Sequence, residues 1–276
     1  MNNSSIGPQT QTACRIFSKV PEITLYFWII KILSTAMGEA TSDFLVFHIN
    51  PYIAVILGAL GFAAAMVLQF RVKRYIAWVY WLLVVMVSIF GTMVADVIHV
   101  VLGVPYYLST SAFAVTLVAI LTLWYRVERT LSIHSIFTFR RELFYWTTVL
   151  ATFALGTAAG DLTAFTLHLG FLASGVIFII LFAIPAVGYW LLNLNDIFAF
   201  WLAYIMTRPL GASFADWLDK PTSTGGLGYG SPIVSMSLTF FIIIFVAYIS
   251  TTKIDIESQI PAFAPVVRDE QLEGDM

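Results

Sequence analysis

Carboxylate side chains inside long apolar stretches are the residues of this sequence that could do chemistry. Four aspartates each follow a tryptophan by 15 residues and a glycine by five, so the pattern Trp-x9-Gly-x4-Asp occurs four times in 276 residues. A carboxylate inside a membrane span is costly unless it faces protein, water or a partner, and we therefore expect these side chains to face inward. The four copies are Trp28, Gly38, Asp43; Trp81, Gly91, Asp96; Trp146, Gly156, Asp161; and Trp201, Gly211, Asp216.

Glu39 is a fifth carboxylate that we place inside a span. If the aspartates converge with it, around one axis or in two pairs, they form an acidic cavity whose ligand is positive, because clustered carboxylates relax by binding protons or a cation. In the alternative reading each aspartate only locks helix packing. Asp216 is followed by Asp219 and Lys220, so we expect it nearest the membrane surface. The candidate cation pathway is lined by Asp43, Asp96, Asp161, Asp216 and Glu39.

Three histidines lie close to the aspartates in sequence. His99 follows Asp96 by three residues and can share its helical face, whereas His48 and His168 follow the aspartates of their units by five and seven residues. Imidazole combined with carboxylate suits a transition metal better than an alkali ion. The sequence requires no cofactor, and a bound divalent metal ion is the one it suggests. Each histidine is otherwise a polar tip at the membrane boundary.

Two basic residues lie inside predicted spans and break the symmetry of the repeat. Lys31 is followed at four-residue steps by Thr35, Glu39 and Asp43, so these side chains form one stripe of a helix. Lys31 is thus a candidate proton relay, a partner that neutralises Glu39, or a side chain that extends to the membrane surface. Arg208 is a candidate ion-pair partner for an aspartate of another unit, or a site for an anion.

The tryptophan and glycine of each copy are interpreted as structural. Tryptophan lies about 22 Å of helix rise before the aspartate, which places it near the opposite membrane surface, where tryptophan commonly acts as an anchor. Glycine within a membrane helix lets another backbone approach closely. The alternative is that glycine breaks the helix and exposes carbonyl groups to an ion, especially at Gly211, which follows Pro209.

The composition predicts an all-α polytopic membrane protein. Hydrophobic residues make up 59% of the chain and charged residues 11%, against about 25% charged in soluble domains. A bilayer is crossed by roughly 20 apolar residues of helix, and the runs here lack the short alternating pattern of a membrane β-barrel. About eight transmembrane helices are predicted, near residues 23–47, 52–70, 75–101, 106–125, 143–168, 171–192, 198–218 and 232–250.

Lysine and arginine gather in alternate connections between the predicted helices, among them Arg71–Arg74 and Arg126–Arg141. By the positive-inside rule both termini are cytoplasmic. The predicted domains are a polar tail 1–22, a membrane domain 23–250 with repeats at about 23–74, 75–142, 143–196 and 197–250, and an acidic tail 251–276. A net charge of −2 without a basic face argues against nucleic acid as a partner. The expected partners are the lipid bilayer and a small cation, and a homo-oligomer is compatible with the sequence.

The spacing of the copies leaves room for two spans in each unit. The motif helices then run parallel, and we expect a pseudo-fourfold or pairwise-pseudosymmetric bundle around an axis along the membrane normal. At these Trp, Gly and Asp positions, from Thr24 to Ser250, the chain resembles a bacterial membrane-protein family described as four tandem copies of a repeat of unknown function. The resemblance implies the fold and a bacterial inner-membrane setting, with multiple spans, and implies no chemistry.

The leading hypothesis is a transporter for cations, either a divalent metal such as manganese or an ion coupled to protons. One alternative is a structural or sensory membrane protein whose aspartates lock the helices. A membrane enzyme acting on lipid or quinone is the weakest candidate, because the chain has no His-Glu-x-x-His, nucleophile elbow or cysteine pair. We therefore expect no enzyme. The sequence leaves open which ion moves, in which direction, and what drives it.

Overall fold

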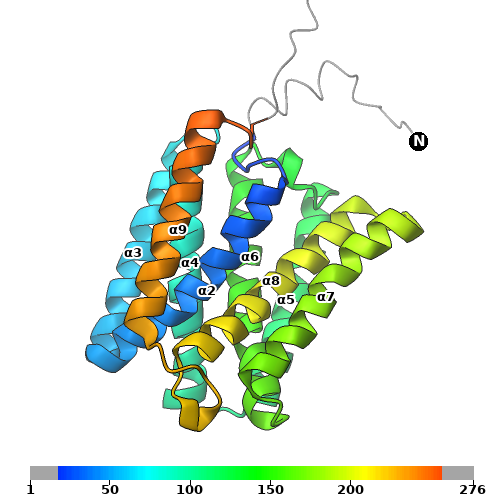
Figure 1. The fold of residues 1–276 in the computed structure, drawn as a ribbon. Helices are drawn as coiled ribbons and strands as arrows, with labels where there is room; N and C mark the ends of the chain where they lie inside the picture. Colours follow the sequence, from blue (N-terminus) through cyan, green and yellow to red (C-terminus); the bar gives the residue numbers. More distant parts are fainter. Residues whose placement is uncertain (1–17, 257–276) are drawn as a thin grey trace, which may run out of the picture.

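The computed structural model describes residues 18–256 and contains eight long α-helices over that range, with no strand (Figure 1). Most of the predicted tails 1–22 and 251–276 lies outside the described residues. The helices are α2 (Leu25–His48), α3 (Pro51–Arg71), α4 (Ala77–Asp96), α5 (Tyr106–Glu128), α6 (Phe139–Asp161), α7 (Gly170–Leu192), α8 (Asp196–Asp219) and α9 (Ser231–Thr252).

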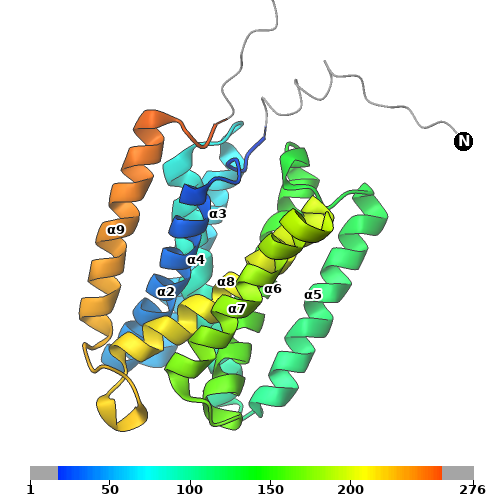
Figure 2. The same ribbon diagram turned by 45° about the vertical axis from the view of Figure 1, so that its right-hand side comes forward.

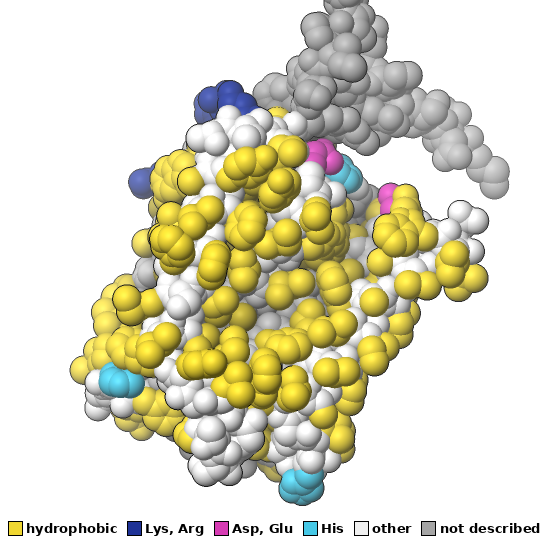
Figure 3. Space-filling view, viewed as in Figure 1, with side chains coloured by type: hydrophobic (Ala, Val, Ile, Leu, Met, Phe, Trp, Pro, Cys, Tyr) yellow, Lys and Arg dark blue, Asp and Glu magenta, His cyan; other side chains and the backbone are white. Residues whose placement is uncertain are grey.

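Seven of these helices are long and apolar enough to cross a membrane, which makes the chain a multi-pass membrane protein. The helix outside the seven is α2, which has 24 residues and carries Lys31, Glu39 and Asp43. Because α2 is surrounded by α4, α8 and α9, its polar side chains are covered by protein rather than by lipid. Apolar side chains cover the face shown in Figure 3, and the lysine and arginine side chains visible there lie at one end.

The helices form two concentric layers. The motif helices α2, α4, α6 and α8 make a closed inner ring, in which each contacts the next and α8 contacts α2. Each outer helix packs on the inner helix of the following repeat, α3 on α4, α5 on α6 and α7 on α8, and α9 closes the circle on α2. Figure 2 shows α9 and α5 on opposite sides of the inner helices. Every repeat therefore needs its neighbour to bury its inner helix.

The motif glycines lie where neighbouring inner helices cross. A Cβ atom at Gly38 would lie 1.8 Å from Ser88 Oγ, and one at Gly211 would lie 1.9 Å from Thr35 Oγ1. All four inner helices run unbroken through their glycines, so the alternative that glycine opens the helix is wrong. The four contacts follow one rule, each glycine meeting the residue three positions before the next glycine of the ring: Gly38 with Ser88, Gly91 with Phe153, Gly156 with Arg208, and Gly211 with Thr35.

The motif tryptophans are not the membrane-surface anchors that the sequence suggested. Trp81, Trp146 and Trp201 are buried, and only Trp28 is partly exposed, against the rings of Phe182 and Phe200. They are buried because the inner helices turn this face toward one another, and the indole rings pack there with other aromatic side chains. The Trp201 Nε1 group donates a hydrogen bond of 2.9 Å to the Leu131 carbonyl oxygen.

The described chain begins and ends at the same end of the bundle, which we call the terminal end (Figure 1). The Glu22 amide donates to the carbonyl oxygen of Asp255 (3.0 Å), and the Lys19 amide donates to that of Ile136 (3.0 Å). The opposite end, which carries the connections before α3, α5, α7 and α9, is called the loop end. Which end faces the cytoplasm stays a prediction.

Helix α6 begins four residues earlier than predicted. Thr138 caps it, because its side-chain oxygen accepts a hydrogen bond from the Arg141 amide. Glu142, expected in a linker, is therefore inside a helix and fully buried, where it accepts hydrogen bonds from Lys19 Nζ (2.6 Å) and Gln69 Nε2 (2.9 Å). These contacts tie the start of the described chain to α3 and α6.

Candidate functional site

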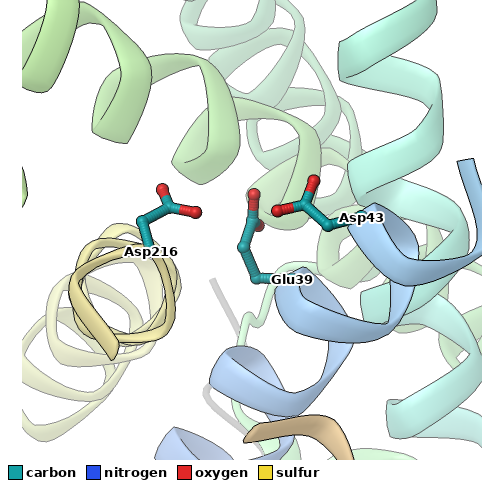
Figure 4. A group of neighbouring side chains, drawn as sticks. All are labelled: Glu39, Asp43 and Asp216. Atoms are coloured by element: carbon teal, nitrogen blue, oxygen red, sulfur yellow. The ribbon is translucent and has the colours of Figure 1, made fainter. Parts of the chain in front are cut away.

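Three carboxylates from two inner helices meet inside the bundle. Each of Glu39, Asp43 and Asp216 has a carboxylate oxygen within 4.8 Å of the oxygens of the other two. Figure 4 shows Glu39 and Asp43 one turn apart on α2 and Asp216 facing them from α8. Glu39 and Asp216 are buried, and Asp43 is partly exposed. We call these three residues the acidic cluster.

Asp216 is more central than the sequence indicated. It was expected nearest the membrane surface, yet its residue is only 6% exposed and belongs to the acidic cluster. The reason is the path of the chain after α8: the segment from Lys220 to Gly230 folds back on the end of that helix, and the Leu227 amide donates to the Trp217 carbonyl oxygen at 2.7 Å. Within this segment Lys220 Nζ lies 3.6 Å from Asp216 Oδ1, and the Gly230 amide donates to the carbonyl oxygen of Asp219, which is also buried.

Arg208 links all four inner helices at one buried point. Its side chain is fully buried, and the two hydrogens of Nη2 are shared among three acceptors, Glu39 Oε2 (2.5 Å), Thr157 Oγ1 (2.7 Å) and Thr92 Oγ1. Glu39, Thr92 and Thr157 each lie 11 residues after the tryptophan of their repeat. The Arg208 side chain therefore contacts the equivalent polar residue of each of the other three repeats. The expected partner of Arg208 was a motif aspartate, and that prediction was wrong.

Two of the three roles predicted for Lys31 are wrong. It is only 1% exposed, so it does not reach the membrane surface, and Glu39 is paired with Arg208 rather than with Lys31. Its Nζ atom lies over the rings of Phe153 and Tyr204, 4.0 and 4.2 Å from their centroids. Lys31 is therefore a buried cation that lies over two aromatic rings.

Lys220 is the residue of the site that sequence reasoning missed. Its Nζ atom contacts the Asp43 carboxylate and lies 3.6 Å from Asp216 Oδ1. Burial opposes the charge on Lys220, but the carboxylates of Asp216 and Asp43 outweigh burial and raise the pKa of the ammonium group. The spacing of four residues from Asp216 was the available signal. Lys220 is an ammonium ion already placed in the acidic cluster.

Asp96 and Asp161 occupy the same repeat position on the other two inner helices. The Asp96 carboxyl interacts electrostatically with Glu39, Asp161 and Asp43, and Ser42 Oγ approaches Asp96 Oδ2 at 3.5 Å. The Asp161 carboxyl interacts with Glu39 and Asp43. The five predicted pathway residues thus form one electrostatic group, within which Glu39, Asp43 and Asp216 are in closest contact.

Asp96 and Asp161 share a backbone feature that Asp43 and Asp216 lack. A π-helical turn begins directly after each of them, at Val97–Val101 and at Leu162–Thr166. Such turns are rare and are often found at functional sites. Repeats two and three therefore differ from repeats one and four at the loop end, and the π-helical turns break the fourfold symmetry of the ring.

The histidines predicted as metal ligands do not join the acidic cluster, which is the one metal-compatible group among the described residues. His48 and His168 are exposed. The ring nitrogen Nδ1 of His99 lies near the Val104 carbonyl oxygen (3.3 Å) and Ser109 Oγ (3.4 Å). The π-helical turn displaces His99 from the α-helical register that would have placed it on the face of Asp96. The ligands offered by the cluster are oxygens only.

The charges of the site do not balance. Five carboxyl groups, Glu39, Asp43, Asp96, Asp161 and Asp216, are accompanied by two basic groups in direct contact with them, Arg208 and Lys220. Three carboxyl groups are left over, and Lys31 is about 12 Å of helix rise from Glu39. Within a membrane such an excess is relieved by bound protons or by a cation.

Comparison with family models finds a repeat of unknown function, DUF347, four times in tandem, at residues 26–75, 79–130, 144–194 and 199–255. The chain belongs to the DUF347 repeat family. No curated protein and no solved structure matches it. Each DUF347 repeat corresponds to one inner helix and the outer helix that follows it, α2 with α3, α4 with α5, α6 with α7, and α8 with α9. The acidic cluster lies between the first and the fourth DUF347 repeats, where the ring closes.

Proposed function

We propose that this protein transports a divalent cation across the membrane and that Glu39, Asp43 and Asp216 bind the ion. The observation that carries the proposal is the meeting of three carboxylates in a bundle whose basic groups do not balance its acidic ones. A divalent cation neutralises two of the three unpaired carboxyl groups, and a bound proton neutralises the third. The protein then acts as a transporter and not as an enzyme.

The oxygen ligands favour a hard cation. Divalent ions such as Mg²⁺, Ca²⁺ and Mn²⁺ are bound by carboxylate oxygens. With metal–oxygen bonds of about 2.0–2.6 Å, two oxygens bound to one ion are separated by at most about twice that length. That limit is about 4.0 Å for the shortest bonds and about 5.2 Å for the longest, and the spacing of at most 4.8 Å within the acidic cluster lies between these two values. Manganese is our first candidate, because it accepts an oxygen-rich site.

Lys220 supplies a means of release. Its ammonium group contacts Asp43 and lies near Asp216, so it occupies the cluster in place of the cation. Because Lys220 follows the last residue of α8 and is partly exposed, it can swing away when the ion enters and return when the ion leaves. The loop end is thus the side from which the acidic cluster is reached.

The setting of the proposal is the bacterial inner membrane, with the terminal end in the cytoplasm. The support for this orientation is the gathering of basic residues there, among them Arg71 at the end of α3 and Lys73 and Arg74 after it. One observation favours a structural role for part of the site: Arg208 bonds three other inner helices and holds the ring together. That role belongs to the Arg208 network and leaves Asp43 and Asp216 for the ion.

The test is cation binding by the purified full-length protein in detergent. Mn²⁺ binding followed by electron paramagnetic resonance, with Mg²⁺, Ca²⁺, Zn²⁺ and Na⁺ as competitors, should show one site in the wild type. Asp216→Asn and Asp43→Asn should weaken it at least about tenfold, 1.4 kcal/mol. The matched control is Asp196→Asn, at an exposed aspartate that begins the same helix. Equal binding by Asp216→Asn and Asp196→Asn would contradict the proposal.

A further inference from the structure

An apolar groove lies between α4 and α9, in the outer layer of the bundle. Its volume is about 400 Å³, which is within the range of pockets that hold small ligands. The lining includes two buried side chains, Met37 of α2 and Trp81 of α4, so the groove reaches inward as far as the inner helices. Trp78 of α4 and Ile243 of α9 also line it and are exposed, so it is open on the side that faces lipid.

The groove exists because α9 lacks an aromatic contact that other outer helices make. Two outer helices reach past the inner helix on which they pack and place an aromatic ring on the tryptophan of the next one: Phe182 of α7 on Trp28 (5.5 Å between ring centroids) and Trp124 of α5 on Trp201 (5.7 Å). In α9, Phe245 and Tyr248 instead contact Tyr26 of α2. The space beside Trp81 is therefore left without an aromatic side chain from α9.

The length of the groove matches one leaflet of a bilayer. On α9 its lining extends from Thr239 to Ser250, which is about 16 Å of helix rise. Half of a hydrocarbon core about 30 Å thick is about 15 Å. The Thr239 hydroxyl donates to the Ser235 carbonyl oxygen of its own helix (2.7 Å) and so presents no free donor to the groove. The groove thus offers an apolar path from the terminal end of α9 to the middle of the membrane.

Basic side chains surround the groove at the terminal end. The Tyr75 hydroxyl donates to Asp255 Oδ2 at 2.5 Å, which ties the start of α4 to the chain after α9 and leaves the Asp255 side chain buried. Arg74 precedes Tyr75, and Lys253 follows the last residue of α9. Within residues 71–78 and 250–256 the exposed charged side chains are all basic: Arg71, Lys73, Arg74 and Lys253. Basic side chains at this level of a membrane attract anionic lipids.

We propose that this groove binds one acyl chain of an anionic phospholipid and that Arg74 and Lys253 bind its phosphate group. The acyl chain covers Met37 and Trp81, and Trp78 lies toward the headgroup, where tryptophan is common in membrane proteins. The lipid joins α9 to α4 where other outer helices use an aromatic side chain. This site is separate from the acidic cluster and does not depend on cation transport.

The experiment counts the lipids bound to the purified full-length protein by native mass spectrometry, after phosphatidylglycerol and phosphatidylethanolamine are added in equal amounts. The wild type should retain one phosphatidylglycerol in preference to phosphatidylethanolamine. Arg74→Gln/Lys253→Gln should weaken phosphatidylglycerol binding at least about tenfold, because each basic side chain near the surface attracts the anionic headgroup. The matched control is Arg126→Gln/Arg129→Gln, which removes two exposed arginines at the same end of α5 and should bind as the wild type.

A second variant tests the groove itself. Ala247→Phe places an aromatic ring in the groove, as the other outer helices do, and should also weaken phosphatidylglycerol binding at least about tenfold. Ala119→Phe, at an exposed alanine of α5, is its control and should bind as the wild type.

Several results would overturn the proposal. They are equal binding of the two lipids by the wild type, wild-type binding by Ala247→Phe, and the mass of a quinone or of a second copy of the chain in place of the phospholipid. Arg74 and Lys253 are exposed, so their double variant decides the matter even where Ala247→Phe does not fold. Wild-type phosphatidylglycerol binding by that double variant would overturn the proposal as well.

Discussion

Replacing Arg208 by methionine should destabilise the protein severely. The substitution leaves Glu39 buried without its partner, since Arg208 Nη2 is 2.5 Å from Glu39 Oε2 and the arginine is fully buried. Removing one member of a buried ion pair costs about 3–5 kcal/mol. For a domain of this size that corresponds to a fall of roughly 6–20 °C in the midpoint of thermal unfolding. Arg126→Met, at an exposed residue near the end of α5, is the control and should stay close to the wild type.

The double variant Arg208→Met/Glu39→Met separates the pair from its surroundings. Replacing a whole buried ion pair by apolar side chains is often neutral. The hydroxyls of Thr92 and Thr157 keep their bonds to the carbonyl oxygens of Ser88 (2.9 Å) and Phe153 (3.2 Å). The double variant should therefore recover most of the lost stability in a thermal unfolding assay in detergent. A single variant as stable as the wild type, or a double variant no better than the single, would refute the reasoning.

Three further predictions follow from the crossings, the built-in ammonium group and the terminal end. Gly211→Ala should cost about 1–3 kcal/mol, because its Cβ would lie 1.9 Å from Thr35 Oγ1, whereas Gly160→Ala, with its nearest neighbour at 3.8 Å, should be tolerated; equal unfolding midpoints would count against the crossing. Lys220→Met should tighten Mn²⁺ binding about tenfold or more, because the variant removes the repulsion between the ammonium group and the ion. That repulsion is at most roughly 4 kcal/mol for two unit charges 4 Å apart at an effective dielectric constant of 20. Because the pKa of Lys220 is raised, the group stays charged near neutrality, so this gain should be equal at mildly acidic and mildly basic pH; weaker binding would show that Lys220 does not compete. Tyr75→Phe should cost about 1 kcal/mol through its lost bond to Asp255, and an unchanged unfolding midpoint would contradict that contact.

The sequence predicted the helical membrane fold because its two signals are local. Apolar runs and the repeated register of Trp, Gly and Asp are properties of single segments, and they gave the helices with boundaries close to those observed, as in the predicted 75–101 and the observed Ala77–Val101. The stripe of Glu39 and Asp43 on one helix is likewise a matter of spacing, and both residues belong to the acidic cluster.

What could not be predicted depends on contacts between segments. Arg208 meets side chains from three other helices, and no spacing within one segment encodes such a partner set. The tryptophans are buried because the inner helices turn their rings toward one another, which the period of one helix does not reveal. His99 left the face of Asp96 because of a π-helical turn, a feature without a recognised sequence signal. Lys220 meets Asp43 because α8 packs on α2, and its spacing from Asp216 alone did not reveal that contact.

Cation flux through the reconstituted protein is the measurement that tests the central claim most directly. Proteoliposomes containing wild-type protein, Asp216→Asn or Asp196→Asn would be loaded with an Mn²⁺-sensitive dye, and external Mn²⁺ would be added. We expect uptake by the wild type and by Asp196→Asn, and loss of uptake by Asp216→Asn at equal protein content. Uptake by Asp216→Asn at the wild-type rate, or no uptake of any cation in the panel by the wild type, would contradict it.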